Sequence, residues 1–156
     1  MGALVLTLMG WMARTVMGMP VNLEMMLGTM LGAQPGAGTW ILGFCIHLTA
    51  GVVFALIYAW CFEHFSHRAG VWTGVAYGFA HAIFAGLLMA MMPMMHPMVP
   101  EQMPPPGAFM SGLGAAGVLM LFVEHFIFGG IAGGMYGEVV HPRPHDIGHA
   151  PLRPTH

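Results

Sequence analysis

Apolar residues form four long runs along the chain, separated by connections rich in glycine, proline and polar residues. The runs cover residues 2–19, 39–62, 70–92 and 111–139. A helix needs about 20 residues to cross the hydrocarbon core of a bilayer. The runs are continuous rather than alternating, which favours helices over the strands of a barrel. The pattern therefore predicts an all-α integral membrane protein with four spans.

Composition supports this interpretation and excludes several alternatives. The chain is 57% hydrophobic and only 6% charged, with a mean hydropathy of +0.73, whereas a soluble chain carries about 25% charged residues. It contains no lysine, and its formal net charge is −2. Without a basic cluster it is not expected to bind nucleic acid, so the lipid bilayer and other transmembrane helices are the expected partners.

The few arginines predict an orientation in the membrane. Arg68 lies between the second and third runs, and Arg143 and Arg153 follow the fourth run. The connections on the opposite side contain no Lys or Arg. Because positively charged loops stay in the cytoplasm, both termini are predicted to be cytoplasmic. The other side is called the outer side below.

The connections differ in what they predict. Asn22 is expected to cap a short helix on the surface of the outer leaflet, with an apolar stripe on one face. That stripe would consist of Leu23, Met26, Leu27, Met30 and Leu31. Residues 93–106 are too rich in proline to predict a helix or a strand. Residues 141–156, rich in Pro and His, are expected to be a disordered cytoplasmic tail.

The second and fourth runs share the pattern Phe-x-x-His-x-x-x-Gly-x₆-Tyr, which starts at Phe44 and again at Phe122. Each matched residue lies 78 positions from its partner. Within a four-span domain of residues 1–140, the halves 1–62 and 70–139 would then be duplicated helical hairpins in parallel repeat. Such repeats are related by an axis along the membrane normal, which would place His47 and His125 across that axis from each other.

Small residues recur at every fourth position in three of the runs, and each repeat histidine heads such a stripe. Stripes of this kind let transmembrane helices approach closely. We therefore expect Gly51, Gly129, Gly133 and Gly137 to serve helix packing, and the two repeat histidines to face a neighbouring helix or a bound group. The stripes are His47, Gly51, Ala55 and Ala59; Gly70, Gly74, Gly78, Ala82, Gly86 and Ala90; and His125, Gly129, Gly133 and Gly137.

His47, His81 and His125 are all predicted to lie within the hydrocarbon, where an imidazole needs a partner. They could form hydrogen bonds between helices. His47 and His125 could instead ligate haem b, although direct packing of the second run on the fourth would leave no room for it. The three rings together could also bind copper or zinc.

Glu124 and Arg14 are the charged residues expected inside the membrane. A carboxylate at the predicted depth of Glu124 is unfavourable. We expect it to be protonated or paired with Arg14, so that both serve structure. The alternative is that Glu124 takes part in a proton relay.

Eighteen methionines gather mainly at the two outer connections. Thioethers favour Cu(I), and Met91-x-x-x-Met95 resembles the paired methionines of Ctr-type copper transporters. Met91, Met95 and His96 are therefore a candidate copper site. The alternative is that these flexible side chains fill gaps in the packing.

Three segments carry a resemblance to a family of small four-helix bacterial membrane proteins of unknown function. They are Val16-Met-Gly-Met-Pro-Val-Asn-Leu-Glu-Met-Met-Leu-Gly-Thr-Met-Leu-Gly32, Gly43–Tyr58 and Gly129–Gly137. The chain departs from the family at Arg14. The resemblance implies a four-helix fold in the bacterial inner membrane, and it implies no activity.

The sequence shows no nucleophile–base set, phosphate loop or paired catalytic carboxylates. The leading prediction is a non-catalytic membrane protein that acts by helix association, as an accessory subunit of a larger complex or as a homo-oligomer. The competing prediction is a haem b or copper protein centred on His47 and His125, with a methionine-rich outer face.

Overall fold

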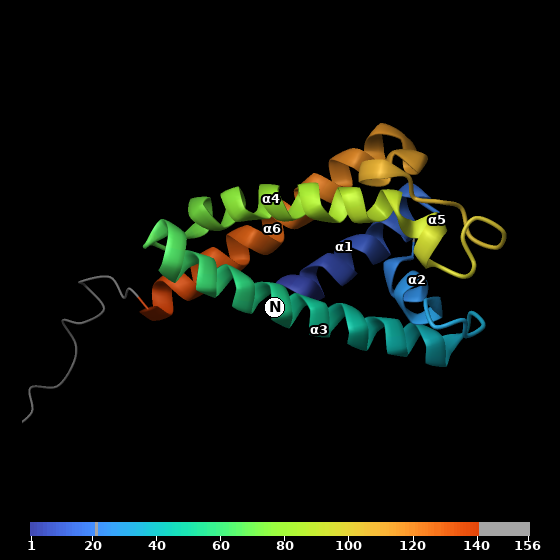
Figure 1. Ribbon diagram of the computed structural model, residues 1–156, viewed down its shortest axis with the longest axis horizontal. Helices are drawn as coiled ribbons and strands as arrows, with labels where there is room; N and C mark the ends of the chain where they lie inside the picture. Colours follow the sequence, from blue (N-terminus) through green and yellow to red (C-terminus); the bar gives the residue numbers. More distant parts are fainter. Residues whose placement is uncertain (21, 141–156) are drawn as a thin grey trace, which may run out of the picture.

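The structure, a computed structural model, describes residues 1–20 and 22–140, with side-chain surroundings described as far as residue 137. Over these residues the chain is all-α (Figure 1). The predicted tail, residues 141–156, lies outside the described residues. The elements are α1 (Gly2–Met17), α2 (Leu23–Thr29), α3 (Ala37–Cys61), the π-helical turn η1 (Phe62–Ser66), α4 (Val71–Ala90), α5 (Met92–Met95), the 3₁₀ helix η2 (Ala108–Leu113) and α6 (Gly114–Val140).

Three of the four predicted spans form helices that are long and apolar enough to cross a membrane: Ala37–Ser66, Val71–Ala90 and Ala108–Gly137. The chain is therefore a multi-pass helical membrane protein in contact with the lipid bilayer. The first predicted span is shorter, because α1 has 16 residues and so extends about 24 Å. It ends where Gly18 adopts the left-handed conformation at φ 66°, a common way to terminate a helix.

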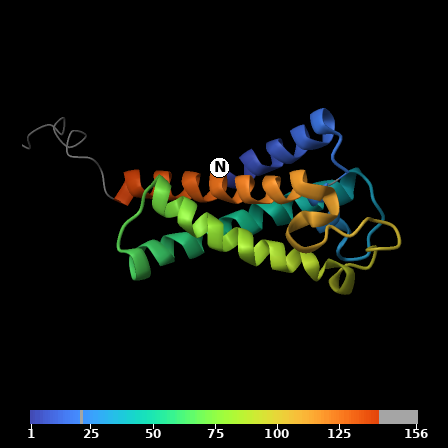
Figure 2. The ribbon, with the colours of Figure 1, turned by 90° about the horizontal axis from the view of Figure 1, so that it is seen from above.

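Helix α1 covers only half the length of the bundle. Ala3 lies against Gly51, midway along α3, and Gly2 lies against Phe128, midway along α6. From there α1 runs to the end of the bundle that carries α2 and α5, called the α2 end (Figures 1 and 2). The opposite end carries η1 and is called the η1 end. Of the four predicted spans, three are thus long helices, and the first is a helix of 16 residues.

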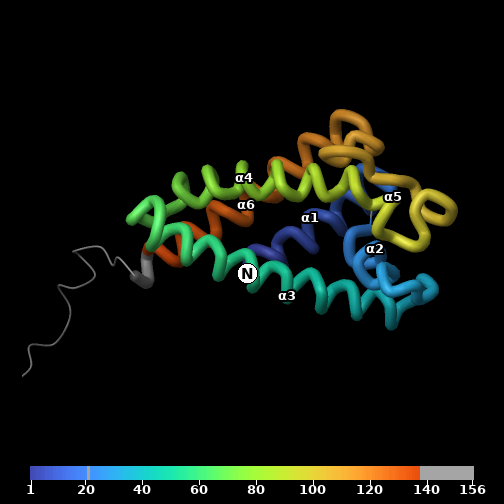
Figure 3. The backbone as a smooth tube through the Cα atoms, viewed as in Figure 1, coloured from blue at the N-terminus to red at the C-terminus, as the bar shows by residue number. Residues whose placement is uncertain are grey.

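Helices α4 and α6 pack closely through their glycines. A methyl group added to Gly74 would overlap the carbonyl oxygen of Gly129, and one added to Gly129 would overlap that of Gly74. Gly133 approaches the carbonyl of Gly70 in the same way. The glycines of α4 and α6 therefore lie at a close helix contact. The α6 stripe faces α4, whereas Gly51 of α3 faces α1. Each repeat glycine thus contacts the other helix of its predicted half, and Figure 3 shows the paths of these helices.

Helix α2 forms where the sequence predicts it. The side-chain oxygen of Asn22 accepts a hydrogen bond of 3.0 Å from the backbone N–H of Met25, which confirms the predicted cap. The helix does not stand apart from the bundle, and its position relative to the leaflet surface stays a prediction. Gly28 lies against the backbone of α3 near Gly43, and both Glu24 and Thr29 are buried. Two facing glycines allow this close approach, so α2 packs into the bundle.

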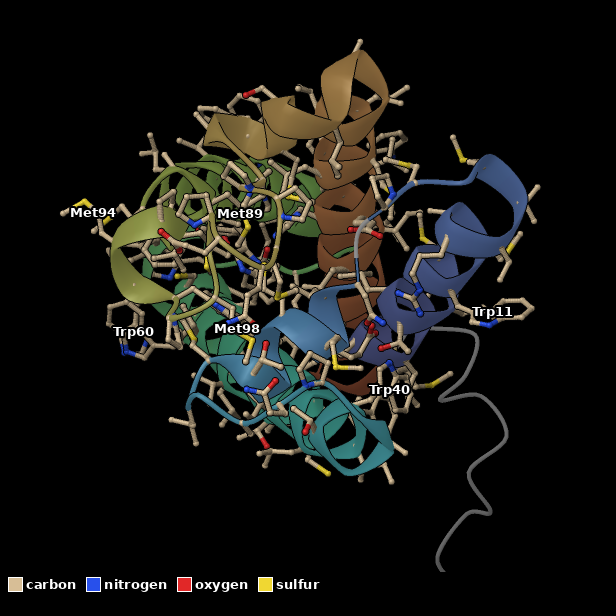
Figure 4. All side chains as sticks on the ribbon, turned by 90° about the vertical axis from the view of Figure 1, so that its right-hand side faces the viewer. Trp11, Trp40, Trp60, Met89, Met94 and Met98 are labelled. Carbon is tan, nitrogen blue, oxygen red and sulfur yellow. The ribbon has the colours of Figure 1, made fainter. Side chains whose placement is uncertain are left out.

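The second outer connection contains more helix than its prolines predicted. Met92–Met95 forms the single turn α5, because Pro93 lies in the first turn, where a missing N–H breaks no helical hydrogen bond. The 3₁₀ helix η2 then leads into α6. In the view onto the α2 end, Met94 points away from the bundle, whereas Met98 points inward and is buried (Figure 4).

Candidate functional site

A cavity of about 200 Å³ lies inside the bundle, toward the α2 end, and residues of α1, α2, α3, α4 and α6 line it. Most of its wall is apolar. Six ionisable side chains interrupt that wall: Arg14, Glu24, His47, His81, Glu124 and His125. The sequence alone indicates all of them except Glu24 as candidate residues. An apolar cavity with a few converging polar groups is the usual form of a ligand site.

Glu24 is the best-satisfied acidic group in the cavity. It is only 1% exposed, and its carboxylate lies 3.4 Å from Nη1 of Arg14 and 3.8 Å from Nδ1 of His47. The same His47 nitrogen lies 3.1 Å from Oγ1 of Thr7. The predicted pairing of Arg14 with Glu124 is therefore corrected, since Arg14 pairs with Glu24. Docking of α2 onto α3 brings Glu24 to the last turn of α1.

Two opposing effects act on the Glu24 carboxyl group. Burial raises its pKa, because a charged group loses solvation. The His47 and Thr7 side chains, the backbone N–H of Glu24 and the positive charge of Arg14 all stabilise the ionised form. Together they outweigh burial and hold the pKa of Glu24 below its ordinary value. Glu24 and Arg14 thus form a charged pair at neutral pH. An acidic residue in a short apolar helix was the sequence signal that could have identified it.

His81 of α4 and His125 of α6 form a second cluster in the cavity wall. Their ring centroids are 4.5 Å apart, with one ring edge-on to the other. Nδ1 of His81 lies 3.2 Å from the hydroxyl oxygen of Tyr58, so this contact joins α4 to α3. Nδ1 of His125 donates a hydrogen bond of 2.7 Å to the backbone oxygen of Leu121 in its own helix. One of the predicted interhelical histidine contacts is therefore present at His81.

Glu124 differs from Glu24 in its surroundings. It lines the cavity from α6. Among the side chains that the structure describes, no Lys or Arg lies within ion-pair distance of Glu124. The guanidinium of Arg14 pairs with Glu24 instead. The cavity thus contains one carboxyl group with a cationic partner and one without.

The cavity does not fit haem. Its volume of about 200 Å³ lies below the roughly 300–1,000 Å³ of clefts that hold drug-sized ligands, and a porphyrin is larger than most of these. Axial ligation would also require the His125 ring to face His47 across the macrocycle, but that ring lies against His81. The prediction of haem b ligated by His47 and His125 is therefore not supported by the geometry.

The predicted metal sites are also not formed. Within the described part of the chain, no group of three His, Cys, Asp or Glu side chains is placed to hold a metal ion. Hence His47, His81 and His125 do not converge on one point. In the proposed copper site, Met91 and Met95 are half exposed and His96 is 3% exposed.

Both ring nitrogens of His96 are occupied. The backbone N–H of Met98 donates to Nδ1 at 3.1 Å, so the ring carries its hydrogen on Nε2. Nε2 lies 2.9 Å from the backbone oxygen of Met26 and 3.2 Å from Oγ1 of Thr29. No lone pair on the ring is free for a metal, which corrects the assignment of His96 as a copper ligand.

Comparisons with protein-family models, with curated protein sequences and with solved structures found no match for this chain. The resemblance to a family of four-helix bacterial membrane proteins stays a prediction. The chemistry of the cavity therefore has to be derived from its own residues. Carboxylates, imidazoles and a guanidinium in an apolar wall can bind and orient a small polar molecule, or hold protons.

Proposed function

We propose that this chain is a membrane protein that binds a small molecule in its central cavity. The convergence of six ionisable side chains from five helices on one cavity carries the proposal. Ionisable groups at membrane depth destabilise a bundle unless they are paired, and apolar residues would pack it equally well. The Arg14–Glu24 pair is satisfied within the protein, whereas Glu124 lines the cavity without a cationic partner among the described side chains.

The volume limits the size of the ligand. A protein cavity of about 150 Å³ accepts benzene. A cavity of about 200 Å³ therefore accepts a molecule of that size or slightly larger. Leu6, Ala50, Ala85 and Met120 supply apolar wall, so the ligand is expected to have a hydrocarbon part as well as a polar group.

Filling the cavity tests this proposal. Ala85→Phe places a ring in the cavity from α4, whereas Ala80→Phe places the same ring on an exposed position of the same helix. The protein in lipid nanodiscs is screened by thermal unfolding against small alcohols, amines, carboxylic acids and amides. We expect at least one compound to raise the unfolding temperature of the wild type and of Ala80→Phe, but not of Ala85→Phe. If no compound acts, or if the two variants respond alike, the proposal is wrong.

A second candidate function is helix association, as an accessory subunit or a homo-oligomer. It rests on a different feature, an apolar groove of about 570 Å³ that lies between α3 and α6 in the η1 half and is bounded by the first residues of α1. Because α1 covers only the other half, the groove remains open there. The small residues Gly51, Ala55 and Ala132 line it, and small residues allow another transmembrane helix to approach closely.

The mass of the assembly in native membranes tests association. Ala55→Trp would block the groove, whereas Ala80→Trp adds the same side chain to an exposed position of α4. We expect the wild type and Ala80→Trp to be extracted in nanodiscs as complexes heavier than one chain, and Ala55→Trp as a single chain. Single chains in all three preparations would eliminate this candidate.

The proposed location is the bacterial inner membrane, with both termini in the cytoplasm and the α2 end outside. Arg68 near the η1 end supports this orientation through the positive-inside rule. In a cysteine-free variant, Met94→Cys at the α2 end is expected to react with an impermeant maleimide added to spheroplasts. Phe65→Cys at the η1 end is expected to react only after lysis, and the reverse result would invert the orientation.

A further inference from the structure

We propose that the ligand of the central cavity is a compact organic cation, a protonated amine whose N–H groups bind the carboxylate of Glu124 and the imidazole of His125. The inference rests on the proposed binding function of the cavity and specifies the chemical class of the ligand. It follows from the charge balance of the cavity, the hydrogen-bonding state of His125 and the shape of the apolar wall.

The charge balance of the cavity favours a cation. With neutral imidazoles and an ionised Glu124, the charges of Arg14, Glu24 and Glu124 sum to one negative charge that no described side chain balances. The chain contains no lysine. Of the remaining arginines, Arg68 lies near the η1 end, and residues 143 and 153 lie outside the described range. An uncompensated carboxylate in a low-dielectric site is strongly unfavourable, so a ligand that brings a positive charge gains most from this cavity.

The hydrogen-bonding state of His125 and Glu124 favours a ligand that donates. Nδ1 of His125 donates to the backbone oxygen of Leu121 at 2.7 Å. In a neutral ring Nε2 then carries a lone pair and can only accept. Glu124 as a carboxylate is also an acceptor only. Glu124 and His125 both line the cavity from α6, and in these protonation states both are acceptors. An ammonium group has three N–H donors and no acceptor.

The rest of the wall suits the hydrocarbon part of an amine. The side chains of Phe54 and Phe128 line the cavity and add aromatic carbon to its wall. Ala50, Ala85 and Leu121 complete an apolar surface that suits the hydrocarbon part of an amine. A bare ammonium ion would leave this surface without a partner. An amine about the size of benzene fills the available volume.

The opposing possibility is that Glu124 is protonated when the cavity is empty and stays so with ligand bound. The cavity would then have no net charge and would prefer a neutral molecule such as an alcohol. A pair of ligands of matched shape separates the two cases. Cyclopentylammonium and cyclopentanol have the same ring and differ in charge and donor number.

Binding is measured by isothermal titration of each compound into the protein in nanodiscs, with empty nanodiscs as the blank for partition into lipid. For the wild type we expect cyclopentylammonium to bind at least tenfold more tightly than cyclopentanol. Glu124→Gln keeps the shape but removes the charge, and it is expected to abolish this preference. Glu101→Gln, at an exposed position of the second outer connection, removes the same formal charge and is expected to keep the preference.

The outcomes are distinct. If cyclopentanol binds as tightly as the ammonium, or if Glu124→Gln retains the preference, the cation assignment is wrong but the cavity still binds a ligand. An acid or amide from the earlier screen that binds to the wild type but not to Ala85→Phe, while the ammonium does not bind, would also show that the cation assignment is wrong and that the cavity binds a ligand. If nothing binds, the proposed function fails as well. The comparison of the two compounds on the wild type stands even if Glu124→Gln does not fold.

Discussion

Nε2 of His96 lies 2.9 Å from the backbone oxygen of Met26 and donates a hydrogen bond to it. This contact joins the second outer connection to α2, which lies in the first outer connection. The hydroxyl of Thr29 adds a contact to the same nitrogen at 3.2 Å. The two outer connections are therefore packed together at the α2 end through the buried imidazole of His96.

Replacing His96 with Ala is expected to destabilise the protein by about 1–3 kcal/mol, because the buried oxygen of Met26 and the N–H of Met98 both lose a partner. Chemical denaturation in mild detergent measures the free energy of unfolding. Met94→Ala in the same connection is the control, since Met94 is 86% exposed and a change there is expected to stay within about 0.5 kcal/mol. Equal changes in the free energy of unfolding for the two substitutions would show that the His96 imidazole does not stabilise the α2 end.

Gly74→Ala is expected to destabilise the bundle by about 1–3 kcal/mol, since overpacking at a rigid contact displaces the backbone. The added methyl would overlap the carbonyl oxygen of Gly129. Gly38→Ala introduces the same methyl in the first turn of α3, where nothing lies within 4 Å. It is expected to be neutral or to stabilise by up to about 1 kcal/mol, because Ala favours helix over Gly. Thermal unfolding in detergent measures both variants. The unfolding temperature is expected to lie below that of the wild type for Gly74→Ala, and to equal or exceed it for Gly38→Ala.

Arg14 and Glu24 are expected to respond asymmetrically to substitution. Arg14→Met leaves a carboxylate that is 2% exposed without its guanidinium, and we expect a loss of at least about 2 kcal/mol. Glu24→Gln is expected to lose less, because the Arg14 side chain is 20% exposed and can move toward water. In a double-mutant cycle the combined variant is expected to be more stable than the sum of the single changes predicts. Strict additivity would mean that the two groups do not interact.

Stability below pH 4.5 is expected to depend on Glu24. Its folded-state pKa lies below the ordinary value of 4.5, so its ionised form contributes stability that is complete above that value. The contribution is lost as the pH falls from 4.5 through the lowered folded-state pKa. The free energy of unfolding of the wild type is therefore expected to fall more steeply in this range than that of Glu24→Gln. Parallel curves for the two proteins would contradict the lowered pKa.

Local patterns in the sequence predicted the elements well, because local chemistry decides them. Continuous apolar runs identified α3, α4 and α6 as membrane helices, and the Asn22 side chain capped α2 as expected. The glycine stripe of α6 predicted a close helix contact, which is present. The length of α1 was overestimated, because Gly18 ends the helix before Pro20 and leaves it at 16 residues.

The sequence by itself determined that the chain is a helical membrane protein, and it brought out five of the six ionisable residues of the cavity. Only the tertiary structure decided which of them meet. Arg14 could pair with either acidic residue, and the docking of α2 through Gly28 and Gly43 selected Glu24. The physical reason is that apolar periodicity and helix caps act within a few residues. The partner of a buried polar group instead depends on how closely distant helices can pack, and that left Glu124 facing the cavity without a cation among the described side chains.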